Sequence, residues 1–198
     1  MTAQAGDTTS SLARRKAAVR LPVRTLRQRL PLAQRKRAAA QAARRLAPRL
    51  RGCRVAVYLS LGEEIDTAPL VRRLRRLGCA LYVPKVGARG QLRFTRLVAG
   101  AALRRNRYGI REPAVLRRPS RLDAIVLPLV AFDGAGHRLG MGGGYYDRLL
   151  GRARPYRKPW RVGFAFAAQE VAAVPVEAHD VRLHAIATER GVRRFRPA

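Results

Sequence analysis

Four glycines lie close together between residues 140 and 144, in the segment RLGMGGGYYDRLL that spans residues 138–150. Glycines at this density let several backbone N–H groups point at one anion, because no side chain blocks its approach. Arg138 and Arg148 could pair with phosphate oxygens, and Asp147 could hold Mg²⁺ beside them. The segment therefore predicts a phosphate-binding loop that leads into a short helix, whose positive N-terminal end would add to the attraction.

A flexible turn and a Walker loop are the alternatives for a segment so rich in glycine. A plain flexible turn would contain many glycines, but it would not need two arginines and an aspartate beside it. A Walker loop is excluded, because no Gly-Lys-Ser or Gly-Lys-Thr sequence is present. A phosphate-binding loop of a different kind therefore remains the favoured prediction.

Apolar segments of strand length alternate with helical patterns along the chain. These expected strands and helices must position the glycine-rich loop. We expect helices at residues 26–50, opened by Pro22, and at residues 68–77, capped by Asp66 and Thr67. Strands separated by helices predict an α/β fold with a mostly parallel sheet, whose ligands lie beyond the carboxyl ends of the strands. The expected strands are residues 55–59, 80–84, 92–97, 124–130, 161–166 and 184–188.

The net charge of the 198-residue chain is +30, because 42 lysines and arginines face only 12 aspartates and glutamates. Such an excess indicates attraction to nucleic acids and other polyanions. Aromatic residues make up only 6% of the chain, which is too few for the stacking surfaces that bind single strands. We therefore expect nonspecific polyanion adhesion, and nucleic-acid binding remains an alternative main function.

The chain length predicts one domain with a buried core. We expect a disordered tail at residues 1–15, a single domain at residues 16–198, and a monomer. No apolar run approaches the roughly 18 residues that span a membrane, so no membrane partner is expected. Cys53 and Cys79 lack metal-ligand spacing and are expected to be small buried side chains in a reducing cytoplasm.

The glycine-rich segment, together with the PLVAFD sequence before it, resembles the signature of the 5-formyltetrahydrofolate cyclo-ligase family. Three further segments match the family in order: YLSLGEEIDT at residues 58–67, GIREP at 109–113 and PVEAHD at 175–180. The resemblance implies a three-layer α/β/α fold with a mostly parallel central sheet, similar to the NagB, RpiA and CoA-transferase enzymes. It also implies an enzyme that uses ATP and Mg²⁺ to convert 5-formyltetrahydrofolate, with or without a polyglutamate tail, to 5,10-methenyltetrahydrofolate.

The resemblance assigns ATP binding to a lysine and an arginine four positions apart, which Lys16 and Arg20 match. Residues at this spacing share one face of a helix, although an ordinary solvated basic segment is the alternative. Gly143 stands where many members carry a lysine, so backbone amides and Arg138 would carry more of the phosphate binding. The residues implied to bind ATP are Lys16, Arg20, Arg138, Leu139, Gly140, Met141, Gly142, Gly143, Gly144, Tyr145 and Tyr146. The catalytic cations among and beside them are Lys16, Arg20, Arg138 and Arg148.

The resemblance also assigns a folate pocket. Glu64 matches a carboxylate that faces the pterin ring, where it could accept hydrogen bonds from the 2-amino and N3–H groups, whereas the neighbouring Glu63 is expected to be solvated. Leu59, Met141 and Tyr145 match positions that line the same pocket, with simple core packing as the alternative.

Asp147 and Asp180 match the Mg²⁺ ligands of the family, although Asp180 could instead be a helix cap. In the family reaction, the formyl oxygen attacks the γ-phosphorus of ATP, and N10 then closes the ring as phosphate departs. No protein nucleophile is needed, which agrees with the absence of a Ser–His or Cys–His arrangement in the sequence. A paralogue with the same ATP loop and another substrate is the alternative.

Overall fold

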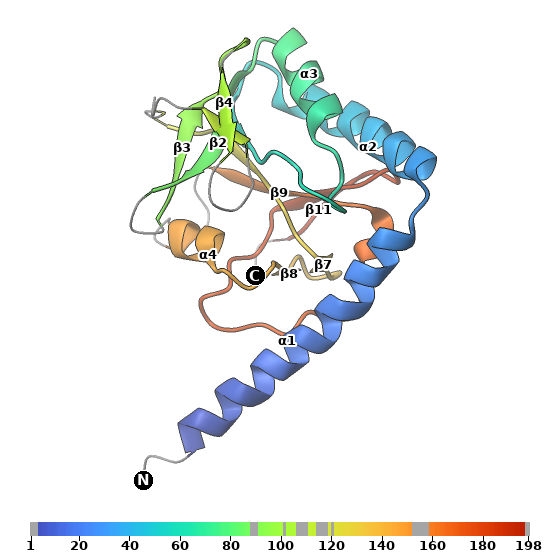
Figure 1. Cartoon of the computed structure of the whole chain (residues 1–198), viewed down its shortest axis with the longest axis vertical. Helices are drawn as coiled ribbons and strands as arrows, with labels where there is room; N and C mark the ends of the chain where they lie inside the picture. Colours follow the sequence, from blue (N-terminus) through green and yellow to red (C-terminus); the bar gives the residue numbers. More distant parts are fainter. Residues whose placement is uncertain are drawn as a thin grey trace.

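A seven-stranded sheet with helices on its faces forms the body of the chain (Figure 1). This computed structural model describes residues 4–87, 91–100, 102–105, 111–113, 119, 121–151 and 159–196. The strands of the sheet are β1 (Arg54–Val57), β2 (Ala80–Val86), β3 (Leu92–Arg96), β6 (Ala124–Leu127), β9 (Trp160–Phe164), β10 (Ala185–Ala187) and β11 (Val192–Arg194).

The strand order in this sheet is β11-β10-β9-β6-β1-β2-β3. The five central strands run parallel, and the two edge strands, β3 and β11, pair antiparallel with their neighbours. In this register Val55 of β1 lies between Leu81 of β2 and Ala124 of β6. The mostly parallel sheet expected from the alternation of strands and helices is confirmed.

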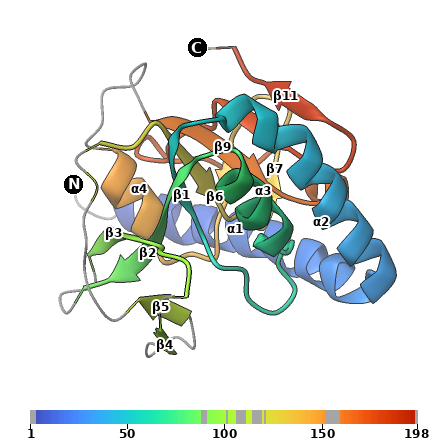
Figure 2. The same cartoon turned by 90° about the horizontal axis from the view of Figure 1, so that it is seen from above.

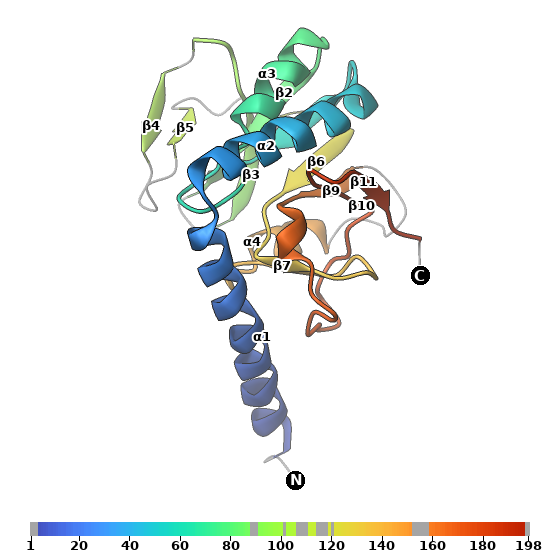
Figure 3. The ribbon, with the colours of Figure 1, turned by 90° about the vertical axis from the view of Figure 1, so that its right-hand side faces the viewer.

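Helices of very different length flank the sheet. They are α1 (Gln4–Arg29), α2 (Leu32–Leu46), α3 (Ala68–Arg76) and α4 (Tyr145–Leu150), with the short 3-10 helices η1 (Ala47–Leu50) and η2 (Ala167–Gln169). α1 packs against η2 and extends away from the body, with the N-terminus at its far end (Figure 3). None of the described helices is long and apolar enough to cross a membrane.

Two small ribbons stand apart from the main sheet. β4 (Leu103–Arg105) pairs with β5 (Arg111–Pro113) next to β2, as Figure 2 shows, and β7 (Ala131–Phe132) pairs with β8 (Arg138–Leu139) just before the glycine-rich loop. The GIREP segment falls partly on β5, and its first two residues, 109 and 110, lie outside the described residues.

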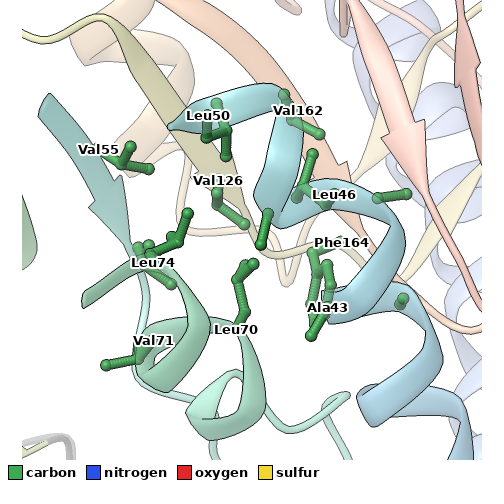
Figure 4. Packing of buried hydrophobic residues seen from close by; sticks show 14 of the residues in the cluster. Ala43, Leu46, Leu50, Val55, Leu70, Val71, Leu74, Val126, Val162 and Phe164 are labelled. Carbon is green, nitrogen blue, oxygen red and sulfur yellow. The ribbon is translucent and has the colours of Figure 1, made fainter. Parts of the chain in front are cut away.

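The core on one face of the sheet lies under α2 and α3 (Figure 4). Both helices have apolar residues at helical spacing, so one stripe of each faces the strands. The buried side chains include Ala43 and Leu46 of α2, Leu50 of η1, Leu70 and Leu74 of α3, and Val55, Val126, Val162 and Phe164 of the sheet. A second cluster on the opposite face contains Ile125, Leu127, Phe132 and Leu150, the last of which belongs to α4.

The start of the N-terminal helical region differs from the expectation. Pro22 lies inside α1, which begins at Gln4, and a separate helix α2 begins after Pro31. Pro22 therefore does not open the helix; its missing N–H is tolerated within a long helix that packs on the hairpin through Val23. Residues 4–15 are helical in the structure, and the disordered tail at residues 1–15 stays a prediction about solution behaviour.

Gly163 in β9 gives a prediction about stability. A Cβ at this position would lie 2.6 Å from Ile186, 2.7 Å from Leu129 and 2.8 Å from Leu183, all in the buried core. We expect Gly163→Ala to lower the free energy of unfolding by about 1–3 kcal/mol, because an overpacked core must shift. Urea denaturation measures this loss. Gly134→Ala is the control, since no atom lies within 4 Å of its added Cβ, and equal stability of the two variants would contradict the packing described.

Candidate functional site

The glycine-rich loop leaves the β7–β8 hairpin at Leu139 and enters α4 at Tyr145. Within it, Gly142 has a φ of +101° and Gly144 a φ of +60°, a left-handed backbone that L side chains rarely adopt. A Cβ on Gly144 would also lie 2.8 Å from the Arg148 guanidinium. Glycine is therefore required here by backbone geometry, as it is in loops whose N–H groups surround an anion.

Arg138 joins this loop to the late acidic segment. Its Nη2 atom donates to Oδ1 of Asp147 at 2.6 Å, and its Nη1 atom donates to the carbonyl of Val181. The same Asp147 oxygen accepts the N–H of Val181 at 3.2 Å. Arg138 is only 8% exposed, so the ion pair lies largely out of water and holds α4 against the segment that ends at Val181.

Two basic side chains of α1, Arg20 and Lys16, contact the loop and the late acidic segment. The Arg20 Nε atom donates to the Gly140 carbonyl at 2.8 Å. One helical turn away, the Lys16 Nζ atom donates to Glu177 at 2.8 Å and to Asp180 at 2.7 Å. Burial acts to lower the pKa of Lys16, but the hydrogen bonds and charges of the two carboxylates outweigh it and raise the pKa above 10.5. Lys16 is therefore a stable cation beside the loop.

The two carboxylates expected to hold Mg²⁺ are connected through Val181, which follows Asp180 in the chain and donates its N–H to Asp147. The Oδ2 atom of Asp147 has no hydrogen-bond partner among the described residues. Asp180, Glu177 and His179 each offer one ligand atom, and these atoms lie within 4.8 Å of one another. Carboxylate oxygens are ligands that Mg²⁺ prefers, so the residues present fit this ion.

Asp180 also has a second set of partners. Besides Lys16, its Oδ2 atom accepts the N–H of Glu177 at 2.9 Å, which closes a local turn. Burial acts to raise the pKa of Asp180, but the hydrogen bonds from Lys16 and Glu177 outweigh it, so the pKa lies below 3.8. Asp180 is therefore ionised at neutral pH.

Glu64 lies in the turn between β1 and α3, beyond the carboxyl end of β1, and its Oε2 atom accepts the N–H of Leu61 at 2.9 Å. Burial raises the pKa of Glu64 above its ordinary value of 4.5, although the Leu61 N–H and the charge of Arg27 act in the opposite direction. Burial likewise raises the pKa of Tyr58 and Tyr146, and the Glu64 charge adds to both shifts. Tyr146 belongs to α4, so the charge of Glu64 acts on a residue that directly follows the glycine-rich loop.

The remaining predicted residues lie in different environments. Arg148 donates through Nη2 to the Gly143 carbonyl at 2.8 Å, and its guanidinium lies 5.2 Å from the centre of the Tyr145 ring. Met141 is 58% exposed, and Leu59 packs against the core under α2 and α3. The structure thus holds Arg148 and Tyr145 at the loop, and the functional roles of all four residues stay predictions.

Sequence reasoning missed a partly buried charge cluster next to the Glu64 turn. Glu63 accepts hydrogen bonds from Arg24 and Arg27, each at 3.0 Å, so the expectation of a solvated Glu63 is wrong. Arg27 is 1% exposed and also donates to the Leu129 carbonyl at 3.2 Å. Glu177 was missed as well, and its place in the PVEAHD segment beside Asp180 was the only signal for it.

The fold itself matches known structures. The NMR structure of Aquifex aeolicus 5,10-methenyltetrahydrofolate synthetase superposes with a TM-score of 0.80 at 33% identity, over 92% of this chain and 94% of that one. A 5,10-methenyltetrahydrofolate synthetase from Mycoplasma pneumoniae superposes with a TM-score of 0.68 at 21% identity, over 88% and 98% of the two chains, and shows the same fold. The architecture is therefore that of the methenyltetrahydrofolate synthetase class of α/β proteins.

Sequence comparison narrows this class to a family. The 5-formyltetrahydrofolate cyclo-ligase of Escherichia coli K12 is 44% identical over 140 residues, which are 68% of this chain and 76% of that protein. The 5-formyltetrahydrofolate cyclo-ligase of Mus musculus is 28% identical over 148 residues, 69% of this chain and 73% of the mouse protein. Residues 12–189 match the 5-formyltetrahydrofolate cyclo-ligase family as a whole. The chain belongs to this family and is an enzyme, as its ordered motifs predicted.

Proposed function

We propose that this enzyme catalyses the ATP-dependent cyclisation of 5-formyltetrahydrofolate to 5,10-methenyltetrahydrofolate, with release of ADP and phosphate. Family membership supports the reaction. One observation supports the nucleotide: Arg20 of α1 contacts the glycine-rich loop at Gly140, with Lys16 one helical turn away and Arg138 just before the loop. Several cations around a loop of glycine amides are suited to bind a polyphosphate.

We place the phosphates over residues 140–144. Arg20 and Arg148 each hold a loop carbonyl, at Gly140 and Gly143, which fixes the orientation of the loop peptides. Arg138 and Lys16 then supply positive charge at the two sides of the loop. Such preorganised cations stabilise the charge that develops on a transferring phosphoryl group.

Mg²⁺ is proposed to bind the carboxylates at the same end of the site. Asp147 would offer its Oδ2 atom, which has no hydrogen-bond partner among the described residues, and Asp180 would offer a carboxylate next to Glu177. When bound, the ion neutralises phosphate charge during transfer. The chain's own contribution is to keep both carboxylates ionised and close to the loop.

For the folate, we propose that Glu64 accepts the hydrogen bonds of the pterin 2-amino and N3–H groups. Its half-buried position would make these bonds stronger than bonds fully exposed to water. Tyr145 and Tyr146 lie at the start of α4, directly after the phosphate loop, and the Glu64 charge acts on the pKa of Tyr146. The arrangement would place the pterin ring beside the γ-phosphate, as the reaction requires.

The proposed chemistry needs no protein nucleophile. The formyl oxygen bonds to the γ-phosphorus while the bond to ADP breaks, which activates the formyl carbon. N10 then attacks this carbon and loses its proton, and the carbon–oxygen bond to phosphate breaks as the ring closes. The chain acts by holding the two substrates in contact and by stabilising the transferred charge.

Substitution of Glu64 tests the folate pocket. We expect Glu64→Gln to raise the KM for 5-formyltetrahydrofolate by about 10- to 100-fold. Glutamine is uncharged and offers one acceptor oxygen, whereas the Glu64 carboxylate offers two to the two pterin donors. In the wild type, kcat/KM for the folate should fall as the pH drops through the raised pKa of Glu64, which lies above 4.5. Steady-state kinetics across pH would show this acid limb, and the glutamine variant should lack it.

Glu170→Gln is the matched control, because Glu170 is an exposed carboxylate paired with Arg193 at the surface. This variant should keep the wild-type KM and the acid limb. A Glu64→Gln enzyme with an unchanged KM for the folate would remove Glu64 from the pocket.

The proposed function is tested by the release of ADP. Purified enzyme with ATP and Mg²⁺ should release ADP at a rate that depends on added 5-formyltetrahydrofolate. ADP release without the folate, or with a different substrate only, would favour a paralogue with the same ATP loop. We also propose that the enzyme acts as a cytoplasmic monomer, which the two free cysteines Cys53 and Cys79 support for the compartment.

A further inference from the structure

Basic side chains line a groove on the outer side of α2 and α3. A cavity of about 460 Å³ lies between these helices and adjoins a second one of about 420 Å³, with Ala40 and Arg73 lining both. We name this feature the α2/α3 groove and define its cations as Lys36, Arg37, Arg44, Arg72, Arg73 and Arg76. The apolar faces of the same two helices pack on the sheet, so the groove faces away from it (Figure 4).

The two helices that form the groove carry basic side chains and no acidic ones. α2 and α3 together contain nine basic residues and no acidic one: five in α2 and four in α3. Elsewhere most carboxylates are already paired with cations, as in the contacts of Glu63, Asp123, Asp147 and Asp180. None of the six groove cations has a hydrogen-bond or ion-pair partner for its side chain among the described residues.

One carboxylate, Asp66, lies at the end of the groove beside the start of α3. Its Oδ1 atom accepts the N–H of Ala68 at 2.9 Å and the hydroxyl of Ser60 at 3.3 Å. It therefore stabilises the helix start, and its single negative charge offsets only one of the six cations. Like charges crowded into a concave site raise the local potential, so an anionic chain would relieve their repulsion.

We propose that the α2/α3 groove binds the phosphate backbone of a nucleic acid. The cations lie along both sides, at positions 36, 37 and 44 of α2 and 72, 73 and 76 of α3, so they match a linear polyanion better than one small ion. No aromatic side chain is among the described residues that line it, so the binding is sequence-tolerant and depends on charge.

The test compares two triple variants with the same loss of charge. Arg37→Gln, Arg73→Gln and Arg76→Gln remove three groove cations, whereas Arg29→Gln, Arg51→Gln and Arg190→Gln remove three exposed arginines elsewhere. Glutamine favours helix nearly as well as arginine, so both variants should fold, and their circular dichroism and folate-dependent ADP release report this. Fluorescence anisotropy with a labelled oligouridylate RNA measures binding as a function of salt.

We expect the groove variant to bind the RNA about tenfold or more weakly than wild type at physiological ionic strength, with a salt slope smaller by about 2. The control variant should change affinity by less than the groove variant does at every salt concentration. If both variants weakened RNA binding equally, the attraction would come from the overall charge of the protein and not from the groove. That result would overturn the proposal. Groove-dependent binding of a polyglutamate peptide that is tighter than that of RNA of equal charge would overturn the assignment to nucleic acid.

Discussion

Replacement of Arg138 by alanine should lower kcat/KM for ATP by about 10²- to 10³-fold, the loss seen when one preorganised donor to a developing charge is removed. Arg138 is buried, donates to Asp147 at 2.6 Å and reaches the Val181 carbonyl, so it both carries charge and holds α4 in place. The loss should appear mainly in kcat, because the transferring phosphoryl group gains its charge in the transition state. Steady-state kinetics of methenyltetrahydrofolate formation measures it.

Two further variants separate this effect from a loss of structure. Arg193→Ala breaks a surface ion pair of 2.7 Å with Glu170 and should leave kcat/KM within about twofold of wild type, as surface pairs contribute little. Arg138→Lys keeps the charge but loses the planar pair of donors, so it should recover only part of the activity. A folded Arg138→Ala enzyme with wild-type kinetics would remove Arg138 from the phosphate site.

Replacement of Lys16 by methionine should raise the KM for ATP by about 10- to 100-fold, because charged hydrogen bonds to phosphate contribute on this scale. Methionine keeps the length of the side chain and its helix preference, so α1 should persist. The melting temperature must be recorded as well, since Glu177 and Asp180 lose the cation that lies 2.8 and 2.7 Å from them.

Lys36→Met is the matched control for Lys16→Met. Lys36 lies in the α2/α3 groove, away from the glycine-rich loop, and loses the same ammonium group. Its KM for ATP should stay at the wild-type value. If both variants raised the KM for ATP equally, the effect would reflect the overall charge of the protein and not a specific contact of Lys16.

The glycine-rich loop could be predicted from sequence because its requirement is local. Gly142 and Gly144 have positive φ, which favours glycine, and Arg148 lies about one helical turn beyond Gly144. The conformation of the loop can therefore be inferred from the residue types in this short segment. The pairing of Lys16 with Glu177 and Asp180 could not be predicted in this way. It joins positions 161 and 164 residues apart, and only the packing of α1 against the end of the chain brings them together.

The wrong prediction of a solvated Glu63 has a similar cause. Its partner Arg27 is 36 positions away, on a helix whose start was misplaced at Pro22, so no local pattern showed that the two would meet. The α2/α3 groove could not be predicted for the same reason. The arginines of each helix are visible in the sequence, but only the packing of the helices against each other brings Arg37 and Arg73 to one cavity system.

The most direct test of the proposed function is formation of the methenyl product. Enzyme, 5-formyltetrahydrofolate, ATP and Mg²⁺ are mixed, and the near-ultraviolet absorbance of 5,10-methenyltetrahydrofolate is followed with time. We predict a rise that requires ATP and is lost in Asp147→Ala and Arg138→Ala. No rise from folded enzyme that still binds ATP would contradict the assignment of 5-formyltetrahydrofolate as the substrate.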